Sequence, residues 1–154
     1  MPISEEAQQL AALLLALTQP DTQGIRQAEV ALKPLLKDPR CVPALIEVLK
    51  ARSEQSDAVR HIASIVLRKR LPGHYSKFDA ATQAQLKSEL LTILSSEPER
   101  NVRKGVVDLA AAILKVSPEA WPELWSFVAA ASQDSHPDAR ELAFWLLAEM
   151  TDTV

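Results

Sequence analysis

Three histidines and one cysteine are the residues of this sequence best suited to catalysis or metal binding. His61, His74 and His136 are scattered and show none of the short spacings at which zinc ligands occur. Cys41 stands at the start of a predicted helix, where the helix dipole can lower the pKa of a thiol, but no histidine or asparagine context accompanies it. We predict no catalytic residue, no metal site and no cofactor, so the chain is not expected to be an enzyme.

A basic run, Arg68-Lys69-Arg70, is the second feature with possible chemistry. Cations near the C-terminal end of a helix complement its dipole and usually stay solvated. The same cations could instead contact an acidic partner. Only part of the run can face one way, since successive residues of a helix point in different directions. Both interpretations stay open at this point.

The composition is that of a soluble globular chain. The 154 residues are enough for one domain, 47% of them are apolar, and the net charge is −3. A chain without a basic excess is not predicted to bind nucleic acid directly. A single cysteine excludes an intramolecular disulfide and fits a reducing compartment. The longest apolar run, residues 10–17, is far below the roughly 20 residues that span a bilayer, so no membrane insertion is expected.

The elements that must position these residues are helices. Apolar residues recur at helical spacing almost everywhere, and no segment alternates cleanly with the period of a strand. Pro39, Pro98, Pro118 and Pro137 stand at the gaps, because proline is tolerated in a first helical turn. The predicted helices cover about residues 4–18, 22–37, 40–52, 57–71, 79–96, 99–116, 119–132 and 137–152.

Local signals set the ends of these helices. Leu71-Pro72-Gly73 is expected to end the fourth helix, since proline disrupts a helix interior. Asp38, Ser117 and Ser135 are suitable acceptors for the N-caps of the helices that follow them.

A short pattern, an arginine followed three residues later by a small residue, recurs along the chain. It occurs at Arg60, Arg103 and Arg140, about 40 residues apart, and a weaker copy lies at Arg26. A period of about 40 with two helices per unit is that of HEAT repeats. We predict an all-α solenoid of about four antiparallel HEAT-type hairpins, at about residues 4–37, 40–71, 79–116 and 119–152.

Stacked hairpins bury their apolar faces against their neighbours. The stem of each repeat arginine can pack while its guanidinium reaches a carboxylate or a carbonyl. The expected core includes Leu45, Leu49, Ile62 and Leu109, and core packing is also the default for Trp121, Trp125 and Trp145.

Helical phase marks the positions that should face away from this core. Counted from each repeat arginine, the residues one, four and eight positions on point away from the apolar stripe. In the second hairpin these are His61, Ser64 and Arg68; in the third, the first is Lys104, and Asp108 lies beside the next.

The order of these features resembles the N-terminal domain of importin-β (karyopherin-β) nuclear transport receptors. An early repeat of that family resembles the segment at Arg60, with Lys69 in place of an asparagine and Tyr75 in place of a tryptophan. The basic run and the phrase Glu97-Pro98-x-x-Asn101-Val102-Arg103 resemble the importin-4-like branch. The matching residues are Val59, Arg60, Ala63, Ser64, Ile65, Leu67 and Arg68, with Gln27-Ala28-Glu29 and Leu32 upstream and Trp121-Pro122-Glu123-Leu124 downstream.

This resemblance implies a function and a set of partners. Family members bind the GTPase Ran in its GTP form through the inner, second helices of their first repeats, and this binding releases import cargo. The implied partners are therefore Ran-GTP, import cargo proteins of basic character and FG nucleoporins, met while the receptor shuttles between cytoplasm and nucleus. His61, Ser64, Arg68, Lys104 and Asp108 become the candidates for Ran contact. Residues 1–154 are expected to form a single HEAT-repeat domain, the N-terminal fragment of a longer solenoid.

Two other functions compete with this one. A generic HEAT scaffold would hold a protein complex together without binding Ran. A HEAT-like module acting on nucleic acid, with base-excision chemistry, is disfavoured because the chain lacks a clustered basic stripe.

Overall fold

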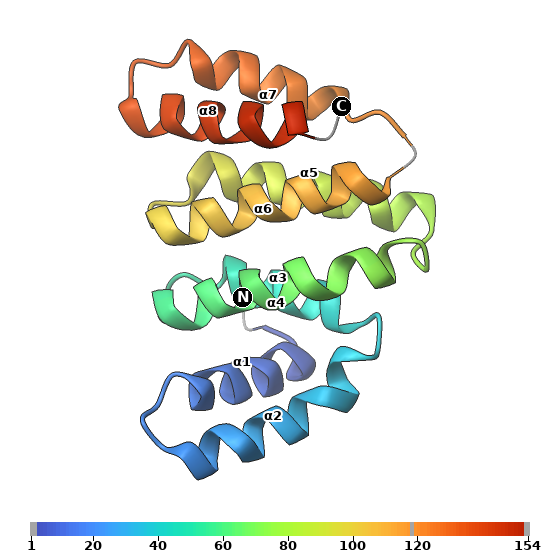
Figure 1. Cartoon of the computed structure of the whole chain (residues 1–154), viewed down its shortest axis with the longest axis vertical. Helices are drawn as coiled ribbons and strands as arrows, with labels where there is room; N and C mark the ends of the chain where they lie inside the picture. The colour runs from blue at the N-terminus through green and yellow to red at the C-terminus, as the bar shows by residue number, and fades with distance from the viewer. Residues whose placement is uncertain (1–2, 118, 153–154) are drawn as a thin grey trace. The chain divides into compact units, whose positions relative to one another are not determined.

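The computed structural model describes residues 3–117 and 119–152, and within them all regular structure is helical. Figure 1 shows the helices following one another as successive antiparallel pairs. No helix in these ranges is long and apolar enough to cross a membrane. The eight helices are α1 (Glu5–Leu17), α2 (Thr22–Leu36), α3 (Cys41–Lys50), α4 (Asp57–Tyr75), α5 (Ala80–Ser96), α6 (Arg100–Val116), α7 (Pro122–Ser132) and α8 (Pro137–Asp152).

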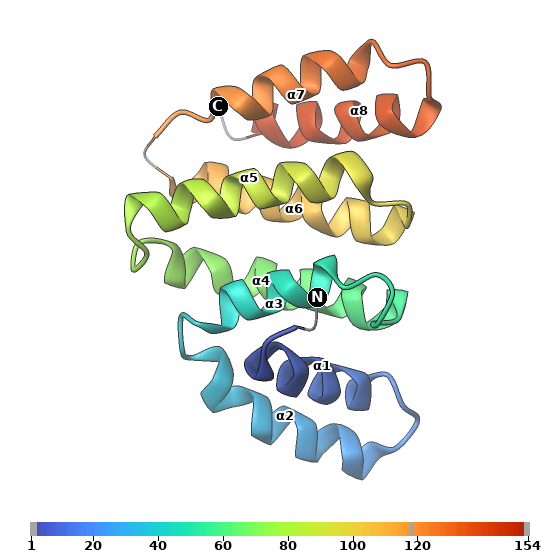
Figure 2. The ribbon, with the colours of Figure 1, turned by 180° about the vertical axis from the view of Figure 1, so that it is seen from behind.

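The chain groups into two compact units, Met1–Arg70 (unit 1) and Leu71–Val154 (unit 2). In unit 1, α1 packs against α2 and α3. A side-chain bond ties the start of α1 to α3, because the Ser4 hydroxyl donates to Glu47 (2.6 Å) and accepts from the Ala7 N–H (3.2 Å). In unit 2, α6 packs against α5 and α8, and α7 packs against α8; these pairs are also side by side in Figure 2. The single domain stays a prediction.

Three of the four aliphatic residues predicted for the core are buried. Leu45, Leu49 and Leu109 are fully buried, which confirms their assignment. Ile62 is only half-buried, so its assignment is wrong. The buried residues of α4 include Val59 and Ala63 but also polar Arg60, and they continue at every fourth position through Leu67. The buried face of α4 is therefore not the face that the apolar residues alone had indicated. It is turned about the helix axis, away from Ile62.

The fourth helix is longer than predicted. It runs through Pro72, which has no N–H to donate to the helix, and ends at Tyr75. A proline inside a helix costs about 3 kcal/mol. Burial of Leu71, His74 and Tyr75 offsets this cost, since each is less than 10% exposed and stays on the packed side only while the helix continues. The Tyr75 carbonyl then accepts a bond from the Gln83 amide (2.9 Å), which joins α4 to the start of α5.

The N-caps also differ from those predicted. Asp38 does not cap α3; it accepts from the Arg40 N–H (2.9 Å) and binds the Arg40 guanidinium. Ser117 ends α6, where its N–H donates to Ile113. The helix after it, α7, begins at Pro122 rather than 119, with Trp121 as a cap residue that makes no side-chain bond. At the start of α8 the acceptor is the His136 ring, which takes the Asp138 N–H (3.1 Å).

Replacing Tyr75 with phenylalanine is expected to leave the free energy of unfolding unchanged or to raise it by about 1 kcal/mol. The Tyr75 hydroxyl is buried and has no hydrogen-bond partner among the described residues. Its transfer from water therefore destabilises the folded state, and phenylalanine removes this contribution. Urea unfolding measures the change. Tyr75→Ala is the control, expected to lose about 3–5 kcal/mol with the ring. A loss of more than about 1 kcal/mol in Tyr75→Phe would show that the hydroxyl has a partner.

Candidate functional site

The repeat arginines build the loops that lead into the second helices. The Nη1 of Arg103 donates to the carbonyls of Glu97 (3.2 Å) and Pro98 (2.8 Å). The Nη1 of Arg140 makes the same pair of bonds, to residues 134 (2.9 Å) and 135 (2.8 Å). We call this arrangement the arginine fork. The arginine fork has a structural role, because it holds the backbone just before α6 and α8. Other residues form the neighbouring faces of these helices.

In unit 1, the predicted site residues on α4 divide into accessible and buried ones. Arg68 is exposed and His61 is half-buried. Ser64 is fully buried, and its hydroxyl donates to the His61 carbonyl of its own helix (2.6 Å). Ser64 is therefore wrong as a partner-contacting residue. The equivalent position in α6, Val107, is also fully buried, so the residue four positions after the repeat arginine belongs to the packed face.

The basic run on α4 is partly accessible. Arg68 and Lys69 are exposed, while Arg70 is half-buried. Because α4 continues to Tyr75, Arg68 and Lys69 lie before its last turn, where the helix dipole has little effect. The dipole therefore does not account for this run, and contact of Arg68 with a partner stays a prediction.

In unit 2, the predicted residues Lys104 and Asp108 lie one turn apart on α6, with Lys104 exposed and Asp108 half-buried. Three further residues join Lys104 in a basic–aromatic cluster that runs from α6 to α8: Arg100, Glu141 and Trp145. The guanidinium of Arg100 lies 5.0 Å from the centre of the Trp145 ring, and the Lys104 Nζ lies 5.3 Å from it. Both distances are within the range of cation–π attraction.

An ion pair fixes one side of this cluster. Arg100 donates two bonds to the Glu141 carboxylate (3.0 and 3.2 Å). These bonds hold the pKa of Glu141 below its usual value and raise that of Arg100, so both groups are charged at neutral pH. Because Arg100 is paired with Glu141, Lys104 is the cation of this cluster that has no ion pair among the described residues.

The sequence-based reasoning missed Arg100, Glu141 and Trp145. The spacing of Arg100 and Lys104, four residues apart on one helix, was the available signal, since such residues are neighbours on a helix surface. Trp145 was assigned to the core by default, but it is only half-buried. Trp125, assigned in the same way, is 52% exposed, and only Trp121 is buried.

The residues considered for catalysis do not come together. Burial raises the pKa of the Cys41 thiol to about 11, against a smaller opposing influence from Arg70, so burial outweighs any lowering by the start of the helix. His74 is buried, and His136 is exposed beside Asp138. Within the described residues, no three histidine, cysteine or acidic side chains are grouped as metal ligands would be.

Comparison with known proteins gives a consistent family. Residues 28–96 match the model of the importin-beta N-terminal domain. Mouse importin-4 is 30% identical over 90% of this chain, and the probable importin subunit beta-4 of Schizosaccharomyces pombe is 34% identical over 95% of it. Human importin-4 is 35% identical over 77% of the chain. The chain spans only 13% of the mouse protein and 14% of the S. pombe protein.

Solved structures support the same fold. Kap121p bound to RanGTP matches 97% of the chain with a TM-score of 0.84 and 24% identity, and the chain covers 15% of it. Kap121p bound to Pho4p matches with the same TM-score and 22% identity, over 97% of this chain and 15% of that one. At this identity the likeness establishes the fold alone, an all-α solenoid of HEAT-type hairpins.

Proposed function

Because the chain carries an importin-beta N-terminal domain and belongs to the importin-β family, we propose that it is the Ran-GTP-binding part of a nuclear import receptor. Ran-GTP binds the second helices of the first hairpins and thereby controls the release of cargo. The chain acts as a binding module and not as an enzyme. The observation that carries this proposal is the match to the importin-beta N-terminal domain, joined to exposed charges on the second helices α4 and α6.

Four of the five sequence-predicted residues remain candidates for Ran contact, two in each unit. They are His61 and Arg68 on α4, and Lys104 and Asp108 on α6, each at least partly exposed. Charges of this kind steer the encounter and fix its orientation more than they add affinity. Trp145 supports the surface by contacting the Lys104 ammonium, and Arg100 contacts the same ring.

The wider partner set is proposed from the same family membership. The fold is shared with Kap121p, which has been solved with RanGTP, Ste12p, Pho4p and Nup53p. For this chain we propose Ran-GTP, basic import cargo and FG nucleoporins as partners, in a protein that shuttles between cytoplasm and nucleus.

We also propose that this chain is the N-terminal fragment of a longer solenoid. On the last hairpin Trp125, Phe144 and Leu147 are exposed by 52%, 69% and 39%. Phe144 stands four positions after Arg140, and the equivalent Val107 of the preceding hairpin is fully buried. A further hairpin packed on α7 and α8 would cover these side chains, as repeat proteins require of their internal faces.

Charge reversal at Arg68 and Lys104 is expected to weaken binding of Ran-GTP. Each exposed charge is worth roughly 0.2–1 kcal/mol, so Arg68→Glu combined with Lys104→Glu should lower the affinity about twofold to thirtyfold. Biolayer interferometry measures the affinity of the full-length receptor and of its double variant for Ran. Ran is loaded with a non-hydrolysable GTP analogue in one series and with GDP in the other. The unmodified protein should bind the GTP form in clear preference.

The matched control is Lys77→Glu, which reverses an exposed charge in the loop after α4 and should change the affinity less than twofold. Thermal unfolding of each variant checks the fold. If the double variant binds Ran-GTP within twofold of the original, these cations are solvated helix surface. If neither form of Ran binds at all, the generic HEAT scaffold becomes the better description of the chain.

A further inference from the structure

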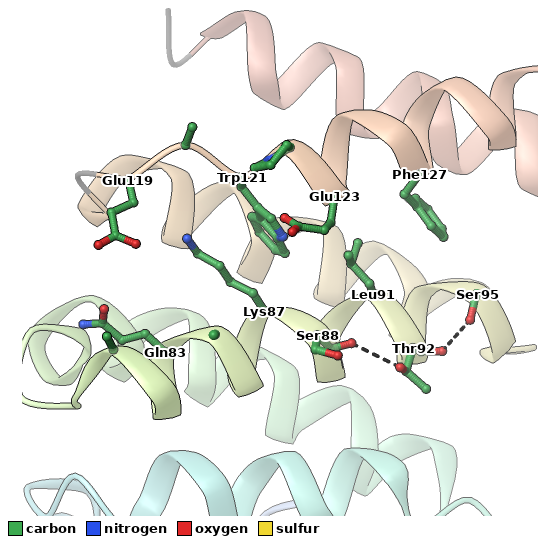
Figure 3. A pocket seen from close by; sticks show the side chains of 14 residues that line it. Gln83, Lys87, Ser88, Leu91, Thr92, Ser95, Glu119, Trp121, Glu123 and Phe127 are labelled. Atoms are coloured by element: carbon green, nitrogen blue, oxygen red, sulfur yellow. Dashed lines mark hydrogen bonds between the residues drawn. The ribbon is translucent and has the colours of Figure 1, made fainter.

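The segment between α6 and α7 carries a serine whose hydroxyl contacts a cation. The Nζ of Lys87 on α5 donates to the Ser117 hydroxyl (3.3 Å) and lies 5.7 Å from the centre of the Trp121 ring. Figure 3 shows the Lys87 side chain directed from α5 toward the segment that carries Glu119 and Trp121. Lys87 forms no ion pair among the described residues. Its ammonium is therefore open to an anion placed on Ser117.

The backbone at Ser117 is extended and ends α6. Its φ is −83° and its ψ is 124°, and its N–H donates to the Ile113 carbonyl (2.8 Å). A residue that precedes a proline is held in this conformation, and residue 118 of the sequence is a proline. Ser117 itself is half-buried, while Val116 and Glu119 are exposed. An enzyme that binds its substrate as an extended segment can therefore approach this hydroxyl outside the helices.

The sequence around Ser117 indicates the class of enzyme. Of the ten prolines in the sequence, Pro118 is the only one that directly follows a serine or a threonine. Proline-directed protein kinases phosphorylate a serine or threonine when a proline comes next. Ser117 is thus the one residue of this chain with the pattern that such a kinase recognises.

We propose that Ser117 is a phosphorylation site for a proline-directed serine/threonine kinase and that Lys87 binds the phosphate. The Ser117 Oγ attacks the γ-phosphorus of ATP, and the new Oγ–P bond forms as the bond to the departing ADP oxygen breaks. The hydroxyl proton passes to a carboxylate base of the kinase. The product carries a charge of about −2 and three strong acceptor oxygens. The bond from Lys87 then becomes charge-assisted on both sides, which makes it roughly twice as strong as a neutral one.

Nearby groups oppose the phosphate, so the pairing with Lys87 decides its effect. Ser117 follows the C-terminal end of α6, where the helix dipole disfavours an anion. Phosphorylation also removes the weak bond that the Ser117 hydroxyl donates to the Glu119 carbonyl (3.5 Å). With Lys87 in place, the phosphate ties the segment before α7 to α5 and so links the two hairpins of unit 2. This modification is independent of Ran binding.

Incubation of the purified chain with ATP and a cyclin-dependent kinase tests the site. Mass spectrometry should locate phosphate on Ser117, and Pro118→Ala should slow its incorporation roughly tenfold or more. Pro20→Ala is the matched control, since it removes an exposed proline that follows a glutamine, and it should leave the rate unchanged. Circular dichroism verifies that each chain is folded. If the kinase modifies a peptide of residues 112–123 but not the folded chain, Ser117 is not a site.

Phosphorus NMR and thermal unfolding of the phosphorylated chain test the role of Lys87. Lys87→Gln should raise the second pKa of the phosphate, ordinarily about 6, by roughly 0.2–0.7, because Lys87 favours the dianion. Phosphorylation should lower the Tm of Lys87→Gln by roughly 1–4 °C more than that of the original chain. Lys33→Gln removes the same charge from an exposed position of unit 1 and should change neither value. If the phosphate titrates alike in the original chain and in Lys87→Gln, Lys87 does not bind it.

Discussion

Replacing Arg103 with alanine is expected to lower the free energy of unfolding by about 2–4 kcal/mol. Arg103 is 6% exposed, and its guanidinium holds the carbonyls of Glu97 and Pro98 at the entry to α6. Hydrogen bonds to a charged donor are worth about 1.5–3 kcal/mol each. The loss stays below their sum because the buried Nε of Arg103 has no partner in the described residues, and alanine removes that cost.

The chain contains a matched control for this change. Arg140 makes the same two backbone bonds before α8 but is exposed to solvent. Water can replace its guanidinium, so Arg140→Ala should lose less than about 1 kcal/mol. Urea unfolding followed by circular dichroism compares the two variants. Equal losses would mean that the fork acts through its bonds alone and that burial adds nothing.

Leu109→Ala is expected to lower the free energy of unfolding by about 2–5 kcal/mol. The Leu109 side chain is fully buried in α6, the helix that packs against both α5 and α8. Alanine leaves a cavity, and the closely packed side chains around it cannot move enough to fill it. The free energy of this cavity adds to the free energy lost with the buried apolar surface.

A second leucine of unit 2 provides the comparison. Leu147 is 39% exposed on α8, and Leu147→Ala should lose less than about 1 kcal/mol because little buried surface is removed. Both values come from urea unfolding under identical conditions. A loss below about 0.5 kcal/mol for Leu109 would show that the assigned core of α6 is wrong.

The helical repeat could be predicted because it depends on short-range spacing. The arginine pattern at Arg60, Arg103 and Arg140 marks three second helices in the structure, and the predicted helices begin and end near the observed ones. The end of α4 could not be predicted in this way. Pro72 is a local signal for a helix end, whereas the burial of Tyr75 that keeps the helix intact depends on tertiary packing.

The error at Ser64 has a different origin. The helical face was inferred from apolar residues, but the packed stripe of α4 contains two polar ones, Arg60 and Ser64. Leaving them out rotated the stripe toward Ile62 and placed Ser64 on the exposed side. A buried serine that bonds to its own helix has the same spacing as a solvated one, so the sequence alone does not separate the two.

The basic–aromatic cluster was missed because it joins residues of two hairpins. Arg100 and Trp145 are 5.0 Å apart in space, but their contact depends on how α8 packs on α6. Periodicity identifies which residues share a helix face; it does not tell which residue of the next hairpin each will meet. Lys104 was predicted as an exposed cation, while the ring that orients it was assigned to the core.

The arginine fork affects how a repeat protein of this kind can gain hairpins during evolution. Arg103 and Arg140 each donate hydrogen bonds to the carbonyls five and six residues before them. The residues that shape the loop in each of these two hairpins therefore belong to the hairpin itself. A stretch of gene that is copied in tandem would therefore yield a hairpin with its turn already correctly shaped. Selection then has only to adjust the apolar face by which the new copy meets its neighbour, and an array can lengthen one duplication at a time.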